Sequence, residues 1–120
     1  MKKEFKEIQN KYKNKIKKYL ESIPAIHKDY DVYVDFVIDY ELNEYFIITI
    51  GNYCKLRLNC EKIPVINLSY PYQFSITHEM RETGKVLSIL SDRENFINLI
   101  KLAENFYLET DNILKDEGKI

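Results

Sequence analysis

The segment from Asp31 to Tyr40 alternates acidic and apolar residues, and it constrains the fold more than any other part of the chain. A β-strand points successive side chains to opposite faces, so this pattern predicts a strand with one buried and one solvated face. The pattern fixes the fold class and the orientation of the strand but names no reaction. The apolar positions are Val32, Val34, Phe36, Ile38 and Tyr40, and the aspartates are Asp31, Asp35 and Asp39.

The first hairpin is predicted to turn through a three-residue loop at positions 41–43. This loop sets Ile38 opposite Phe46, so that each core-facing side chain meets another across the two strands. A two-residue loop would shift the pairing by one residue and place Asp39 beside Phe46 in the buried face. The apolar pattern therefore selects the longer loop.

A second hairpin is predicted to turn at positions 51–53, which sets Ile50 opposite Cys54. The two hairpins form a three-stranded antiparallel meander with a dry face and a mixed face. We expect at least one helix to pack on the dry face. That face comprises Val34, Phe36, Ile38, Phe46, Ile48, Ile50, Leu56 and Leu58.

Two amphipathic helices are predicted to flank the strands. Apolar residues recur at spacings of three and four over residues 3–23, and Pro24 discourages continuation of that helix. Ser91 and Glu94 have the spacing of a capping box, which predicts a second helix running to about Thr110. Its predicted apolar stripe comprises Phe96, Ile97, Ile100, Ala103, Phe106 and Tyr107.

Further strands are predicted between the meander and the second helix. Residues 63–66 are expected to form an edge strand, since Pro64 would cost a central strand a hydrogen bond. Alternation predicts strands at 73–77 and 85–90, joined by a turn at 82–84. The expected fold is α+β: an N-terminal helix, a four- to five-stranded antiparallel meander sheet, and a C-terminal helix packed on the sheet.

The composition fits one soluble domain spanning residues 1–120. The net charge of -1 gives no global attraction to nucleic acid or to an anionic membrane, and no apolar run reaches the roughly 20 residues of a membrane span. The lysine-rich N-terminus lacks the features of a signal peptide, which predicts a cytoplasmic protein. The preference for Lys, Asn, Ile and Tyr is typical of bacteria or phages with AT-rich genomes.

The cysteines are predicted to be buried free thiols. Cys54 and Cys60 lie six residues apart on one predicted strand, which separates their Cα atoms by roughly 20 Å. A disulfide tolerates only about 4.4–6.8 Å. Two unbridged cysteines agree with a cytoplasmic location.

No residue pattern in the chain predicts a metal, a cofactor or a catalytic residue, so we expect a protein that is not an enzyme. Asp35 and Asp39 would lie roughly 13 Å apart along a strand, too far to share a metal ion. His78 and Glu79 lack the second histidine of a zinc-binding helix. Pairing of a Cys60 nucleophile with His78 stays open, although a core-facing thiol is poorly reactive.

The mixed face of the meander has the composition of a binding patch. Its predicted cross-strand rows place tyrosine, arginine and aliphatic side chains at the centre and charges around them, and tyrosine and arginine are favoured interface anchors. A helix covering this face, or a simple solvated sheet surface, is the alternative. The candidate partner-binding residues are Tyr33, Asp35, Val37, Asp39, Tyr45, Ile47 and Arg57.

These features favour a small protein-binding module, most plausibly an inhibitor or immunity-type protein that blocks a partner protein by occlusion. One alternative is nucleic-acid binding through the lysine-rich N-terminal helix. A small enzyme without a recognisable motif is a second alternative. Homodimerisation through the mixed face or an edge strand is a third. No membrane partner is expected.

Overall fold

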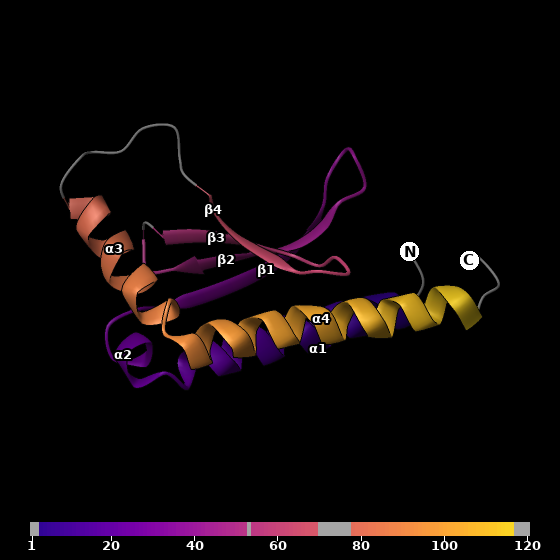
Figure 1. Ribbon diagram of the computed structural model, residues 1–120, viewed down its shortest axis with the longest axis horizontal. Coiled ribbons are helices and arrows are strands. Elements are labelled where there is room, and N and C mark those ends of the chain that lie inside the picture. The colour runs from indigo at the N-terminus through magenta and orange to yellow at the C-terminus, as the bar shows by residue number, and fades with distance from the viewer. Residues whose placement is uncertain (1–2, 53, 70–77, 117–120) are drawn as a thin grey trace.

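The computed structural model of the chain describes residues 3–52, 54–69 and 78–116, and it confirms the α+β class (Figure 1). A four-stranded antiparallel sheet has the order β1-β2-β3-β4. In chain order the elements are α1 (Lys3–Glu21), α2 (Pro24–His27), β1 (Val32–Ile38), β2 (Glu44–Ile50), β3 (Cys54–Asn59), β4 (Val65–Ser69), α3 (His78–Leu90) and α4 (Arg93–Asp116).

Helices α1 and α4 lie side by side along one side of the sheet (Figure 1). They run antiparallel, because Lys11 in α1 contacts Glu109 near the end of α4, while Tyr19 near the end of α1 bonds Asn95 in α4. The short helix α3 stands at one end of this arrangement. Among the described residues, no helix has the length and apolar content that crossing a membrane requires.

The core forms where α1 and α4 meet the predicted dry face of the sheet. Phe106 of α4 is completely buried, and its ring centroid lies 5.1 Å from that of Phe46 in β2 and 5.6 Å from that of Tyr12 in α1. These edge-to-face contacts join both helices to the sheet. The sheet residues buried here are Val32, Val34, Phe46, Ile48, Ile50, Cys54, Leu56 and Leu58.

The first hairpin differs from the prediction by two residues. Ile38 lies opposite Glu44, and Phe36 lies opposite Phe46, so the loop spans 39–43 rather than 41–43. The shift is even, and each side chain therefore keeps its predicted face. The last core position is lost, however: Ile38, at the end of β1 and opposite Glu44, is 39% exposed.

The second hairpin has the predicted register, with Ile50 opposite Cys54 and both residues buried. Gly51 adopts a φ of 68°, in the left-handed region that glycine favours. A Cβ atom at this position would lie only 3.0 Å from the Tyr30 ring. The glycine therefore permits both the turn and the packing of Tyr30. The predicted edge strand is also confirmed, with β4 beginning just after Pro64.

The predicted turn at 82–84 and strand at 85–90 are wrong, because these residues lie in α3. Thr83, Val86 and Leu90 are the buried positions, and their spacing of three and four is helical. A short apolar run fits both the helical period of 3.6 and the strand period of two. The residues at 83–84, which are typical of turns, favoured the strand. The strand predicted at 73–77 lies outside the described residues.

Helix α4 forms as predicted but with a different cap and a rotated apolar stripe. Asp92, not Ser91, caps it: the Asn95 backbone N–H lies 3.4 Å from an Asp92 carboxylate oxygen. The predicted core positions Phe96 and Ile97 are 45% and 37% exposed. The predicted Ala103 and Phe106 are buried, and the helix also buries Leu99 and Thr110, which were not predicted.

We expect Phe106→Ala to lower the free energy of unfolding by about 3–5 kcal/mol, because it empties the junction between both helices and the sheet. The matched control is Phe96→Ala on the same helix, which should cost about 1 kcal/mol or less because Phe96 is half exposed. Urea unfolding of both variants measures the difference. Equal losses would show that the aromatic junction contributes no more than the helix surface.

Candidate functional site

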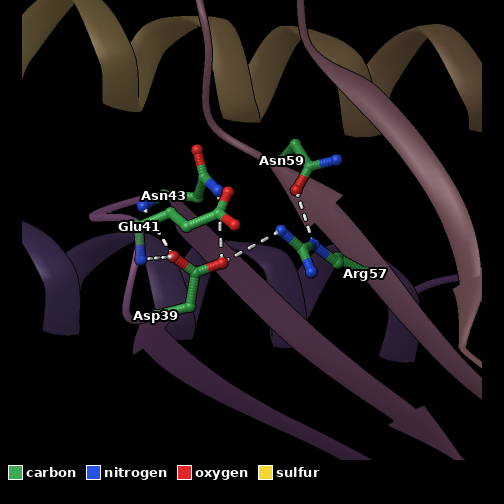
Figure 2. Close-up of polar contacts among 5 residues, drawn as sticks. All are labelled: Asp39, Glu41, Asn43, Arg57 and Asn59. Atoms are coloured by element: carbon green, nitrogen blue, oxygen red, sulfur yellow. Dashed lines mark hydrogen bonds and ion pairs between the residues drawn. The ribbon is translucent and has the colours of Figure 1, made fainter.

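The odd-numbered side chains of β1, β2 and β3 form a surface that neither α1 nor α4 covers, which we call the open face. Figure 2 shows this face toward the viewer, with the two helices behind the sheet. The two-residue shift in register changes which residues lie opposite one another on this face. The observed cross-strand rows are Tyr33–Thr49–Lys55, Asp35–Ile47–Arg57 and Val37–Tyr45–Asn59.

Three contacts hold the Arg57 side chain on the open face, and Figure 2 shows two of them, those with Asn59 and Asp39. Its guanidinium carbon lies 3.7 Å from the centroid of the Tyr45 ring, a stacked cation–π contact. Its Nε donates to the Asn59 side-chain oxygen at 2.8 Å, and its Nη2 lies 3.6 Å from an Asp39 carboxylate oxygen. The side chain is 33% exposed, so part of the fixed guanidinium faces solvent.

The prediction that Asp39 lies in a cross-strand row is wrong, because β1 ends at Ile38. Asp39 begins the loop and reaches Arg57 from there. One carboxylate oxygen accepts the backbone N–H groups of Glu41 and Asn43, both at 2.9 Å, and the other accepts the Asn43 side-chain amide at 3.2 Å. These bonds, led by the Asn43 backbone N–H, and the nearby Arg57 lower the pKa of the Asp39 carboxyl. The same carboxylate thus shapes the loop and orients the arginine.

The structure brings six of the seven predicted residues onto the open face and links the seventh, Asp39, to it. Val37, Tyr45 and Ile47 are half buried between neighbours, whereas Asp35 is exposed. Tyr33 lies toward one end of the face and is 60% exposed.

Sequence reasoning missed the exposed apolar residues at the hairpin end of the sheet. The loop between β1 and β2 and the loop between β3 and β4 extend at the same end (Figure 1). The alternation places Tyr40 on the buried side of the strand, yet it is fully exposed. Apolar residues inside loop sequences were the available signal. The exposed residues of this hairpin end are Ile38, Tyr40, Leu42, Ile63 and Val65.

Burial changes the acidity of other ionisable groups in and beside the sheet. Cys54 and Cys60 are free and buried as predicted, and burial raises the pKa of both thiols, that of Cys54 to about 11. Burial also raises the pKa of Glu44. The side chain of His78 lies outside the described part of the chain. Within that part, no three potential metal ligands gather to form a site.

No protein-family model, curated protein or solved structure matches the chain.

We expect both thiols to react slowly with an aromatic disulfide reagent at pH 8 in the folded protein and rapidly in urea. Burial keeps them protonated and inaccessible, and the thiolate is the reactive form. Absorbance of the released thiolate measures both rates. Rapid native labelling of Cys60 would revive the nucleophile hypothesis.

We expect the Asp39 carboxyl to titrate below its ordinary pKa of 3.8 when followed by NMR. A lowered native pKa means that ionised Asp39 stabilises the fold at neutral pH. This advantage over Asp39→Asn should persist above about pH 4 and disappear as the pH falls through the native pKa.

The exposed Asp31 provides the matched control for this titration, because its side chain makes no hydrogen bond to the loop. Asp31→Asn should change the free energy of unfolding by about 0.5 kcal/mol or less. A pH-independent difference between Asp39→Asn and the parent protein would contradict the proposed anchoring of the loop.

Proposed function

We propose that the chain is a protein-binding module that uses the open face to cover a functional surface of a partner protein. The observation that carries the proposal is the fixed Arg57 at the centre of this uncovered sheet surface. An arginine stacked on Tyr45 loses little conformational freedom on binding, which removes one of the main costs of association. Arginine and tyrosine are also the residues most often found as binding hot spots.

The unused donors of Arg57 define the chemistry of the partner. A guanidinium has five N–H donors, and contacts within the described residues engage the Nε and one Nη nitrogen. A carboxylate on the partner would complete this set through charge-assisted hydrogen bonds. The half-buried Ile47 and Val37 would meet an apolar surface beside that carboxylate.

The hairpin end supplies the additional area that a stable complex needs. Three strands about 4.8 Å apart, with a rise of about 3.3 Å per residue, give the open face roughly 14 by 20 Å, or about 300 Å². A standard interface buries about 800 Å² on each partner. The exposed apolar side chains of Tyr40, Leu42 and Ile63 extend the surface toward that size.

The proposed mechanism is steric and electrostatic occlusion, as in an inhibitor or immunity-type protein. Binding requires no bond to be made or broken in the partner. The free buried thiols favour action in the reducing cytoplasm.

Affinity purification from the source cell with purified wild-type and variant proteins tests this proposal. We expect a stoichiometric protein partner whose dissociation constant rises about thirtyfold or more in Tyr45→Ala/Arg57→Ala, as for loss of a hot spot. The matched control is Phe96→Ala/Arg93→Ala, which removes one aromatic residue and one arginine from the surface of α4. This control should bind as the parent protein does.

Equal binding by both double variants would reject the open face as the contact surface. Recovery of no stoichiometric protein partner would reject the function itself. Circular dichroism and urea unfolding of each variant establish that altered binding does not reflect unfolding.

A further inference from the structure

A groove of about 440 Å³ runs between α1 and α4. It opens away from the sheet, because the residues that line it differ from those that each helix buries toward the strands. Ile16 and Leu20 of α1, with Leu99 and Ala103 of α4, belong to the core instead. The groove is lined by Lys15, Lys18, Tyr19, Asn98, Lys101, Leu102 and Asn105.

Three ammonium groups gather at this groove without a carboxylate among its lining residues. Lys15 and Lys18 lie one turn apart on α1, and Lys101 stands across from them on α4. Within the described residues, none of the three makes an ion pair, although the Lys15 ammonium lies 5.1 Å from the centroid of the Tyr12 ring. Other lysines of α1 are engaged differently: Lys11 lies 2.8 Å from Glu109, and Lys17 donates to a backbone oxygen of β1.

The polar wall of the groove is held by a short hydrogen-bond chain. The Tyr19 hydroxyl donates to the Asn95 side-chain oxygen at 2.8 Å and accepts the Asn98 side-chain amide at 3.2 Å. Leu102 and the Tyr19 ring add apolar surface beside the ammonium groups. The groove thus offers hydrogen-bonded polar groups, three ammonium groups and an apolar contact area in one place.

We propose that this groove binds the phosphate groups of a phosphorylated ligand. Like charges held together in a groove repel one another, and a multivalent anion relieves that repulsion. Lysine is a common phosphate ligand in proteins. The apolar contact area suits the sugar or base attached to the phosphate, so the source is a free nucleotide or a nucleic-acid backbone. This site is separate from the open face and does not depend on the function proposed for it.

Isothermal titration with inorganic pyrophosphate and then ATP at 20 mM salt tests the inference in the full chain. The test variant is Lys15→Gln/Lys18→Gln/Lys101→Gln, and the matched control is Lys6→Gln/Lys28→Gln/Lys62→Gln. Both variants change the formal net charge from -1 to -4, but the control lysines are exposed and lie outside the groove. We expect saturable binding of both anions that weakens about tenfold or more in the test variant, from roughly two- to fivefold per lysine.

The control variant should keep the affinity of the parent protein. Equal weakening in both triple variants would overturn the site, because it would show attraction by net charge alone. Absence of saturable binding at low salt would also overturn it. Side-chain amide signals of Asn98 and Asn105 provide a measurement that needs no variant: they should shift on adding pyrophosphate, and unchanged signals would reject the groove.

A ten-nucleotide single strand separates the two sources of phosphate. Binding of the strand tighter than ATP, with an affinity that falls steeply as salt rises, would identify a nucleic-acid backbone as the ligand. ATP binding as tight as that of the strand would identify a free nucleotide. Both results support the phosphate site, and both require the groove lysines.

Discussion

The packing of Phe106 against the sheet and against α1 determines how the two layers of the molecule meet. Its ring lies within 5.6 Å of Phe36, Phe46 and Tyr12, measured between centroids, so one side chain of α4 contacts both β1 and β2 and the other long helix. Because a single junction joins both helices to the same side of the sheet, the core is one-sided. The open face is the direct consequence of this arrangement.

The loop at 39–43 determines what the open face contains. An aspartate that begins a longer loop can accept backbone N–H groups that a tighter turn would leave unpaired. Asp39 accepts two of them and turns its second oxygen toward Arg57. A three-residue loop would have kept Asp39 in the strand, opposite Tyr45. The two-residue shift therefore replaces a simple cross-strand row with a clamp on the arginine.

The alternating pattern was sufficient to predict the two faces of the sheet, since a strand register that is wrong by two leaves every side chain on its face. The pattern could not determine loop length, because that depends on hydrogen bonds between Asp39 and backbone groups whose positions the sequence does not reveal.

Helix α3 was misassigned for a related reason: Thr83 and Gly84 suggest a turn, and the six residues that follow fit either a helical or a strand period. The open-face residues were predictable from composition and parity. The exposure of Tyr40 and the groove at Lys101 were not, because both depend on tertiary packing.

The lysines of α1 are sorted by the packing of that helix into different roles. The Gly51 N–H donates to the Asp31 carbonyl, which therefore points toward β2. The backbone groups of the next residue, Val32, point the opposite way, to the unpaired edge of β1. There the Lys17 ammonium donates to the Val32 carbonyl oxygen at 3.1 Å. Such a lysine partly blocks edge-to-edge strand pairing. Lys11 instead pairs with Glu109 of α4, and Lys15 and Lys18 line the groove. The net charge conceals this separation, since it sums an acidic segment at 28–44 with a basic α1. The groove and the open face lie on opposite sides of the helix-on-sheet arrangement, so occupation of one leaves the other sterically accessible.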